Sequence, residues 1–314
     1  MSQALQPGNV IGGRYHLLEP VGEGGIAIVW RAVVKGAGAF ERIVAIKVMK
    51  RAFSAAQDHL EMFLEEARIG AELQHPHLIQ VLDFLQDDFK HYCLVMEWIE
   101  GIDLRSLSQR LGGVDRPLPW TLVAHVGVGV LRGLAAAHER RLSSGKLAPV
   151  IHRDVAPQNI LLGLNGAIKL TDFGMARARD RAAAMIAPGF VKGTLSYMAP
   201  EMLAGSDPSP ASDQFALAAT LWESLAGERL FDAKSDVEVY KMIRAGEIRP
   251  LEQRRPDLPS KLIRTVHRAL SMDPSARFLS AREMIHELDE IIRSGPKLDA
   301  DLVIGRAVAQ ARET

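Results

Sequence analysis

The stretch that decides the fold of this 314-residue chain reads IHRDVAPQN, residues Ile151–Asn159. It places an asparagine, Asn159, five positions after Asp154, which itself follows His152 and Arg153. By itself this pattern fits an ordinary charged loop. Its interpretation therefore depends on the motifs that stand before and after it, on their order, and on the elements that carry them.

A glycine-rich segment, GEGGIAIV at residues 22–29, lies near the start of the chain. It follows one predicted strand, residues 15–21, and leads into a second, residues 27–33. Glycines let a backbone approach phosphate oxygens closely and donate N–H groups to them. A glycine-rich hairpin turn is the alternative. The strand that follows argues against a dinucleotide-binding fingerprint, which requires a helix at that point.

A lysine and a pair of glutamates form the next candidate group. Lys47 ends the sequence VAIK, residues 44–47, on a predicted strand. Glu65 and Glu66 lie on a predicted helix, residues 57–73, in which apolar residues recur at helical spacing. Neighbouring helical residues point about 100° apart, so we expect Glu66 rather than Glu65 to face the lysine. Solvated surface charge is the alternative for all three residues.

Further motifs follow the central stretch in order. An apolar run, residues 167–170, leads into TDFG at residues 171–174, and APE stands at residues 199–201. Two single charged residues, Asp213 and Arg277, come later. Generic surface charge would explain any one of these features alone. The ordered set is a far more specific signal than its members.

The spacing of apolar residues predicts two differently built halves. About the first hundred residues contain short β-type runs and one helix, and after Gly101 the pattern becomes helical. The last strong helix begins with a capping box, Ser280-x-x-Glu283. The predicted strands cover residues 15–21, 27–33, 42–49, 81–85 and 91–98, and the predicted helices cover residues 57–73, 120–140, 213–226, 261–270 and 280–293. This organisation predicts an α+β protein with two lobes.

In order and spacing, these motifs resemble the Hanks-type protein kinase family, and the bacterial Ser/Thr kinases in particular. The resemblance implies a bilobal, protein-kinase-like α+β fold with a strand-rich N-lobe, one main helix in that lobe, and a mostly helical C-lobe. The tail shows a short helical pattern around residues 300–311, and the sequence does not decide whether it docks. The expected divisions are an N-terminal extension at 1–13, a kinase domain at 14–293 with N-lobe 14–96, hinge 97–101 and C-lobe 102–293, and a tail at 294–314.

The resemblance also implies roles for the site residues. Asp154 would accept the proton of a substrate hydroxyl, and Asn159 and Asp172 would hold Mg²⁺, with Mn²⁺ as the alternative ion. Lys47 would hold the phosphates of ATP, positioned by Glu66, which lies at the usual spacing before a His-Pro pair. The residues expected to contact ATP are Gly22, Gly24, Gly25, Val29, Ala45, Lys47, Met96, Glu97 and Ile99.

The same resemblance implies structural roles, or roles in selectivity, for other positions. Adenine would lie beside residues 97–99, with Met96 controlling access to the pocket behind it. Asp213 would anchor the catalytic loop through backbone N–H groups, and Arg277 would pair with Glu201. We expect transfer to Ser or Thr rather than Tyr, because Gln158 stands where some tyrosine kinases carry arginine.

Two departures from the family bear on activity. Ala156 stands where Ser/Thr kinases carry a lysine, and losing one aligned cation can slow the reaction by orders of magnitude. Either Lys192 substitutes for it or that lysine is solvent-exposed. Residues 175–193 contain no Ser, Thr or Tyr, so Arg153 lacks an obvious phosphate partner, and Asp180 is a weak permanent substitute. We expect activity without phosphorylation in that segment.

Gly70 is a smaller departure, one turn beyond Glu66 on the predicted helix. Many kinases pack an apolar side chain there, and a glycine inside a helix weakens it by ~1 kcal/mol. We expect this helix to be mobile, with a partner or the C-terminal tail setting its position.

Composition adds limits on the class of protein. Lys+Arg and Asp+Glu both total 38, so net charge provides no drive toward nucleic acid or anionic membranes. The single cysteine, Cys93, cannot form an internal disulfide and fits a buried thiol in a reducing compartment. Residues 1–12 lack a signal-peptide pattern, and the apolar stretch 120–137 contains His125 and Arg132. We expect a cytoplasmic protein without a membrane span or bound nucleic acid.

Three functions stay open from the sequence. An active protein kinase is favoured because Lys47, Glu66, Asp154, Asn159 and Asp172 are all present. A pseudokinase that acts as a nucleotide-binding scaffold is favoured by the missing catalytic-loop lysine. A small-molecule kinase is disfavoured by the APE motif and its expected arginine partner. We expect a protein substrate and, since no sensor domain is visible, a regulatory protein partner.

Overall fold

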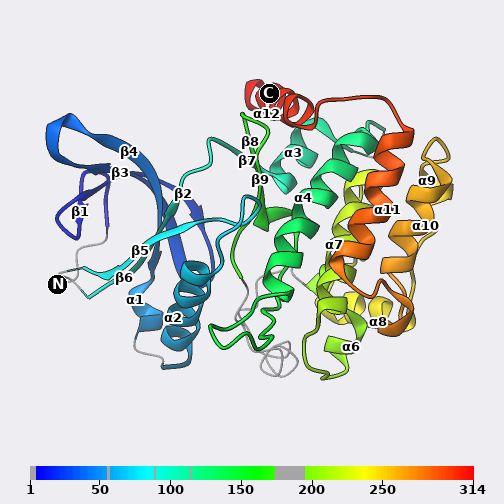
Figure 1. Ribbon diagram of the computed structural model, residues 1–314, viewed down its shortest axis with the longest axis horizontal. Coiled ribbons are helices and arrows are strands. Elements are labelled where there is room, and N and C mark those ends of the chain that lie inside the picture. The colour runs from blue at the N-terminus through cyan, green and yellow to red at the C-terminus, as the bar shows by residue number, and fades with distance from the viewer. Residues whose placement is uncertain (1–4, 55–56, 88–89, 114, 174–194) are drawn as a thin grey trace. The chain divides into compact units, whose positions relative to one another are not determined.

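A computed structural model describes residues 5–54, 57–87, 90–113, 115–173 and 195–314 (Figure 1). The chain divides into two compact units. The first comprises Met1–Gln74 and Ile79–Trp98, and the second comprises His75–Leu78 and Ile99–Thr314. The short segment His75–Leu78 joins the second unit because Leu170 donates its N–H to the His77 carbonyl, 2.9 Å away.

A six-stranded antiparallel sheet, in the order β1-β2-β3-β4-β6-β5, dominates the first unit. All five predicted strands are present, with ends shifted by one or two residues. The two-residue β1 is too short to show the alternation that identifies a strand. The strands are β1 (Val10–Ile11), β2 (Tyr15–Glu23), β3 (Ala27–Lys35), β4 (Glu41–Met49), β5 (Val81–Gln86) and β6 (Tyr92–Glu97), and a 3-10 turn, η1 (Ala37–Ala39), joins β3 to β4.

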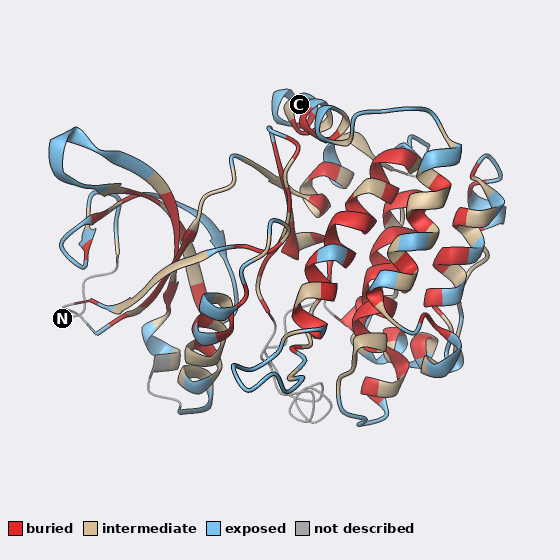
Figure 2. Ribbon diagram, viewed as in Figure 1, coloured by how far each residue is buried: buried red, intermediate tan, exposed pale blue. Residues whose placement is uncertain are grey.

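One core cluster of the first unit lies on one face of this sheet. Trp30 of β3 stands opposite Ile46 of β4, and Ile46 stands opposite Val95 of β6. All three side chains are buried, and Figure 2 shows buried segments in the strands of this sheet. Cys93 is buried in the same cluster, as predicted, and burial raises the pKa of its thiol to about 12.

The main helix of the first unit is α2 (Gln57–Glu72), preceded by the single turn α1 (Arg51–Ser54). A packing contact explains the glycine inside α2. A Cβ atom on Gly70 would lie 2.3 Å from Cγ2 of Val81 in β5, so only glycine permits this approach. The mobility expected for this helix stays a prediction.

Helices build most of the second unit. The long, almost wholly apolar α4 contacts both α7 and α11, and Figure 2 shows α4 and α7 largely buried. The four helices predicted here correspond to α4, α7, α10 and α11. The helices are α3 (Leu104–Leu111), α4 (Trp120–His138), α6 (Pro200–Leu203), α7 (Pro210–Ala226), α8 (Asp236–Ala245), α9 (Leu251–Arg254), α10 (Ser260–Ala269), α11 (Ala281–Ser294) and α12 (Ala300–Glu313), with 3-10 turns η2 (Pro157–Asn159), η3 (Leu195–Tyr197) and η4 (Pro274–Ala276).

Helix α11 begins with half of the predicted capping box. Ser280 accepts the N–H of Glu283 at 3.2 Å, as expected. The Glu283 carboxylate, however, accepts the N–H of Leu279 at 2.7 Å rather than that of Ser280. The long glutamate side chain reaches one residue further back along the chain, so it satisfies the N–H of the residue before the N-cap, while Ser280 satisfies one orphan N–H of the helix.

In the described part of the chain, α4 alone has the length and composition of a membrane span. Of its most apolar window, 78% is buried inside the protein. This burial is the property of a core helix.

A small antiparallel sheet of β7 (Gly101–Asp103), β8 (Ile160–Gly163) and β9 (Ile168–Leu170) completes the second unit. These strands have three or four residues, too few to give a periodic signal in the sequence.

The predicted tail helix is present as α12, which contacts α3 and β8 (Figure 1). A Cβ on Gly305 would lie 2.4 Å from the Leu164 carbonyl oxygen, so the helix backbone approaches the sheet closely. Arg312 pairs with Glu100 at 2.6 Å, and Arg110 donates to the Ala311 carbonyl at 3.0 Å. The tail therefore docks as part of the second unit.

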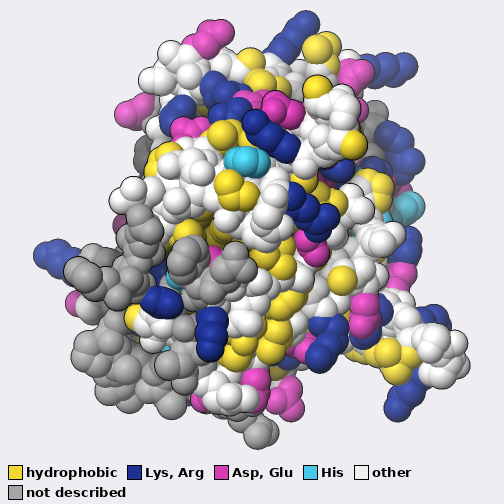
Figure 3. Space-filling view, turned by 90° about the vertical axis from the view of Figure 1, so that its left-hand side faces the viewer, with side chains coloured by type: hydrophobic (Ala, Val, Ile, Leu, Met, Phe, Trp, Pro, Cys, Tyr) yellow, Lys and Arg dark blue, Asp and Glu magenta, His cyan; other side chains and the backbone are white. Residues whose placement is uncertain are grey.

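The protein surface agrees with the balanced composition. On the face drawn in Figure 3, side chains of Lys and Arg are interspersed with those of Asp and Glu among the described residues.

Candidate active site

The loop that carries Asp154 is anchored on one buried carboxylate. Asp213, in α7, accepts the backbone N–H groups of His152 and Arg153, each at 2.8 Å. Nε2 of His138, at the end of α4, donates to the same carboxylate at 2.8 Å. Asp213 is 1% exposed, so these three donors replace water around its charge. The predicted anchoring of the loop by Asp213 is confirmed.

Asn159 fixes the side chain of Asp154. The asparagine ends the 3-10 turn η2, and its Nδ2 donates to the Asp154 carbonyl at 2.8 Å and to Oδ2 of Asp154 at 3.1 Å. With its NH₂ group turned toward Asp154, the amide presents its oxygen on the opposite side. One residue thus orients the carboxylate and offers an oxygen to a cation.

The loop also holds the segment that contains Asp172. The backbone N–H of Thr171 donates to the Asn159 carbonyl at 2.9 Å, and Nε2 of His152 donates to the Thr171 carbonyl at 3.0 Å. Burial lowers the pKa of His152, which keeps the ring neutral and lets Nδ1 accept the Asp154 N–H at 3.3 Å. The Phe173 ring packs on His152, with centroids 4.7 Å apart. Asp172 is therefore held beside Asn159.

In the first unit, Lys47 pairs with Glu66. Lys47 lies on the interior strand β4, opposite Val29 of β3 and Leu94 of β6. Its Nζ lies 2.6 Å from Oε1 of Glu66, and the two side chains are only 13% and 14% exposed. Glu65 instead pairs with Arg68 at 2.8 Å on the helix surface. The structure thus distinguishes between the two glutamates in the way the sequence predicted.

Comparison with known protein families agrees with this geometry. The family described as protein kinase domain matches residues 15–288. The chain belongs to the protein kinase family. Its two units, a strand-rich one with one main helix and a mostly helical one, have the expected kinase fold.

Related kinases come from several bacteria. The tyrosine-protein kinase MasK of Myxococcus xanthus is 36% identical over 283 residues, which cover 89% of this chain and 43% of MasK. The serine/threonine-protein kinase PknA of Mycobacterium tuberculosis is 35% identical over 278 residues, covering 87% of this chain and 60% of PknA. The chain therefore spans well under two thirds of the length of these relatives.

A solved kinase structure shares the fold. The crystal structure of the Mycobacterium tuberculosis PknI kinase domain superposes with a TM-score of 0.65 at 29% sequence identity. The match covers 92% of this chain and 100% of the PknI chain. These bacterial kinases are thus similar to this chain in both sequence and fold.

The glycine-rich segment of this kinase forms the hairpin between β2 and β3. Gly22 stands opposite Val29, and the Gly24 N–H donates to the Ala27 carbonyl at 2.9 Å. Neither Gly22 nor Gly24 has a positive φ. A Cβ on either would make only ordinary contacts, the nearest at 3.9 and 3.7 Å. Among the described residues, neither backbone conformation nor packing therefore requires glycine at these two positions.

The remaining residues expected around ATP fall on both units. In the first, Met96 of β6 stands opposite Ala45 of β4. The Glu97 carboxylate accepts the Gln80 N–H at 2.8 Å, so it has a structural partner of its own. The first unit ends at Trp98 and Ile99 begins the next segment of the second unit, inside the predicted hinge.

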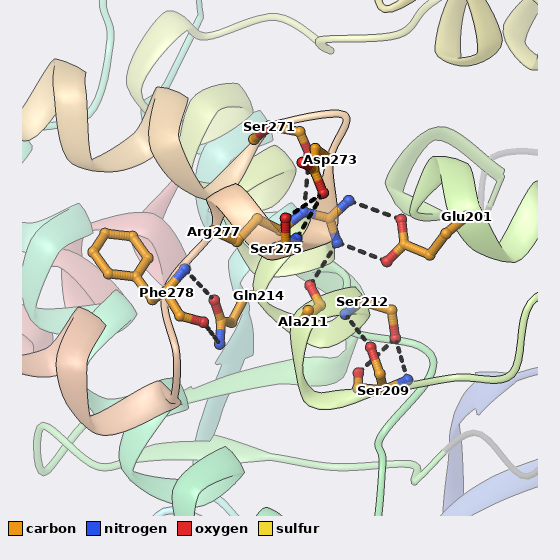
Figure 4. Close-up of polar contacts among 10 residues, drawn as sticks. All are labelled: Glu201, Ser209, Ala211, Ser212, Gln214, Ser271, Asp273, Ser275, Arg277 and Phe278. Carbon is orange, nitrogen blue, oxygen red and sulfur yellow. Dashed lines mark hydrogen bonds and ion pairs between the residues drawn. The ribbon is translucent and has the colours of Figure 1, made fainter.

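The last predicted pair, Arg277 with Glu201, is confirmed (Figure 4). Two guanidinium nitrogens of Arg277 donate to the two Glu201 oxygens at 2.7 Å each. The same side chain, which is 0% exposed, also donates to the carbonyls of Ala211 and Ser271. This network joins the APE segment to the start of α7 and to the turn before Arg277.

Some predictions fall outside the described residues. Lys192 and Asp180 belong to this group, so the structure describes neither the proposed replacement cation nor the proposed substitute for a phosphate. Ala156 is described and is fully buried at the start of η2.

Sequence analysis missed His138 and two polar pairs near the catalytic loop. His138 lies 75 positions before Asp213, and no local pattern connects them. The first pair joins Arg105 to Gln158, and the second joins Tyr197 to Glu223. Only folding brings these residues together.

Proposed function

We propose that this chain is an active Ser/Thr protein kinase that transfers the γ-phosphoryl group of Mg-ATP to a hydroxyl of a protein substrate. The observation that carries the proposal is the ordered catalytic loop. Asp154 is oriented by Asn159 at 3.1 Å in a loop that is itself anchored on Asp213. A scaffold has no need for a carboxylate aligned in this way, whereas a general base does.

In this proposal, each described residue has one task. Asp154 accepts the proton of the attacking Ser or Thr hydroxyl. Lys47, positioned by Glu66, binds phosphate oxygens. Gly22 and Gly24 let the hairpin backbone approach the phosphates, which would account for glycines that the fold itself does not require.

The residues expected to hold Mg²⁺ fit that ion. Mg²⁺ prefers oxygen ligands and usually uses one or two protein carboxylates beside phosphate oxygens and water. Asn159 offers an amide oxygen and Asp172 a carboxylate, and the Thr171–Asn159 backbone bond keeps the two neighbours. Bound Mg²⁺ would neutralise negative charge on the phosphates. Mn²⁺, with similar ligand preferences, is the alternative.

Two further proposals concern the location of the protein and its regulation. We propose a cytoplasmic location, supported by the single buried cysteine, Cys93. We also propose regulation by a protein partner, since α2 carries Glu66 and its position decides whether the Lys47 pair forms.

The decisive experiment measures transfer of radiolabelled phosphate from ATP, with Mg²⁺ or Mn²⁺, to a general protein substrate. Wild type should incorporate label, and Asp154→Asn, which keeps the shape of the side chain, should lose at least about a hundredfold of the rate. Asp207→Asn, an exposed carboxylate, is the matched control and should keep activity. Absence of transfer by wild type, with ATP binding intact in a thermal shift, would instead support the pseudokinase.

Acid hydrolysis of the labelled substrate tests the acceptor. The relative MasK is named a tyrosine kinase and PknA a serine/threonine kinase. Because Gln158 stands where some tyrosine kinases carry arginine, phosphoserine or phosphothreonine is the expected product. Phosphotyrosine alone would contradict the Ser/Thr assignment and leave the kinase activity standing.

A further inference from the structure

An arginine on α3 contacts the catalytic loop of the second unit. Asp103 caps α3 by accepting the Ser106 N–H at 2.8 Å, and this fixes the first turn that carries Arg105. Nη2 of Arg105 donates to Oε1 of Gln158 at 2.6 Å. Gln158 directly precedes Asn159, the residue that orients Asp154. The guanidinium therefore lies close to the proposed site of phosphoryl transfer.

This guanidinium has no counter-ion among the described residues. No described carboxylate pairs with Arg105, and its buried Nε has no hydrogen-bond partner in the described part of the chain. Gln158 supplies a neutral oxygen to one of its five N–H donors. A partly buried, unpaired cation is costly, so a functional reason for its retention is to be expected.

A second pair lies within electrostatic range of Arg105. The Tyr197 hydroxyl of η3 donates to Oε2 of Glu223 in α7 at 2.6 Å. Burial raises the pKa of Glu223, and the charges of Arg229 and Arg105 act in the opposite direction. Arg229 likewise has no carboxylate partner among the described residues. The Glu223 carboxylate is thus already engaged by a tyrosine.

Arg105 is therefore a cation without a carboxylate partner among the described residues. Glu223, the carboxylate on which both arginines act, is hydrogen-bonded to Tyr197, and Asp232, which acts on it in the opposite direction, is exposed to solvent. We propose that Arg105, with Gln158, Tyr197, Glu223 and Arg229 around it, forms a subsite for an acidic side chain of the protein substrate, which we name the Arg105 subsite. This inference rests on the proposed kinase function and adds a substrate class to it.

The position of the subsite limits which substrate residue reaches it. Gln158 stands one residue before Asn159, whose amide touches Asp154. An extended peptide advances about 3.3–3.6 Å per residue. The acidic side chain is accordingly expected within a few residues of the phosphorylated Ser or Thr.

The test uses a positional peptide library with one fixed Ser or Thr and Asp, Ala or Lys at each flanking position. Wild type should prefer Asp over Ala at one position by about tenfold in kcat/KM, which corresponds to about 1.4 kcal/mol. Arg105→Met should remove that preference. Arg105→Glu should reverse it toward Lys, a result that a merely structural role for the arginine would not produce.

A matched control lies on the same helix. Arg110 also belongs to α3 but donates to the Ala311 carbonyl, away from Gln158, so Arg110→Met should keep the Asp preference. Phosphorylation without any acidic preference in wild type, or a preference retained in Arg105→Glu, would overturn the Arg105 subsite and leave the kinase function intact. Absence of phosphorylation of every peptide and protein would remove the proposed function, and the subsite with it.

Discussion

The Lys47–Glu66 pair of the first unit and the Asp213-anchored loop of the second are held in different ways. Nζ of Lys47 and Oε1 of Glu66 lie 2.6 Å apart in an ion pair between a strand and a helix. Asp213 instead accepts two backbone N–H groups and one imidazole N–H, each at 2.8 Å, and is 1% exposed. The geometry of the Lys47–Glu66 pair depends on where a helix lies, whereas the geometry of the loop depends on several buried hydrogen bonds.

The difference follows from the backbone that each site uses. The loop that carries Asp154 includes a positive φ at Arg153 (70°), where a non-glycine residue is strained by about 1–2 kcal/mol. Only several hydrogen bonds to a buried acceptor keep such a loop in one conformation. The lysine pair lies on regular elements and needs no such support, so a shift of α2 alone can make or break it.

The largest expected effect comes from removing the anchor. Asp213→Ala should cost about 4 kcal/mol of unfolding free energy, because the N–H groups of His152 and Arg153 and the imidazole of His138 would be buried without an acceptor. Urea unfolding measures this loss. Asp207→Ala, on the exposed segment before α7, should change stability by less than about 0.5 kcal/mol. A similar small change in Asp213→Ala would show that the loop is held by other contacts.

The docked tail provides the next test, since it extends the second unit beyond the family match. Gly305→Val should cost about 3 kcal/mol, because the new side chain would meet the Leu164 carbonyl, 2.4 Å from the Cβ position. Arg306→Val adds the same β-branched residue on the exposed side of α12 and should cost only the helix-propensity difference. Equal effects of the two variants would mean that α12 does not contribute to stability.

A glycine of the first unit tests whether α2 is held by close packing. Gly70→Ala improves helix propensity by about 1 kcal/mol but places a methyl group 2.3 Å from Val81, so a net loss of about 1–2 kcal/mol is expected. In the double variant with Val81→Ala, much of the loss should be recovered, which a double-mutant cycle measures as coupling. Stabilisation by Gly70→Ala alone would indicate that α2 shifts freely.

Removal of Lys47 should lower activity far more than stability. Lys47→Met is expected to lower stability by about 1–2 kcal/mol, because the loss of the largely buried ion pair with Glu66 is partly offset by the apolar methionine, which needs no buried partner. Phosphoryl transfer should fall by at least about a hundredfold. Lys35→Met removes an exposed lysine that pairs with Glu41 and should leave both quantities nearly unchanged. A loss of stability as large as that of Asp213→Ala would contradict the comparison between the two sites.

The mildest perturbation is acid, and it should act on the second unit. His75, His77, His125, His152 and His267 all lie there and all have pKa values lowered by burial. A histidine that resists protonation when folded stabilises the protein fully above its unfolded pKa of about 6.5 and loses that contribution as the pH falls toward the folded pKa. The urea concentration at the unfolding midpoint should therefore decrease as the pH is lowered from about 7 to about 5. A constant midpoint across this range would contradict it.

Sequence patterns predicted much of the fold. Every long periodic segment became the expected strand or helix, because alternation and helical spacing are local properties of the chain. The short strands β7, β8 and β9 were missed since three or four residues give no period, and the helices α3 and α8 were missed as well. Lys192 and Asp180 lie outside the described residues, so the roles expected for them stay predictions.

The sequence by itself determined the family, the loop that carries Asp154, and the choice of Glu66 over its neighbour, because motif order and helical periodicity are written along the chain. Only the tertiary structure decided what holds that loop and what surrounds it. His138 meets Asp213 across 75 positions and Arg105 meets Gln158 across 53. Such contacts arise from the packing of helices whose relative places no local pattern records, and the proposed substrate preference depends on one of them.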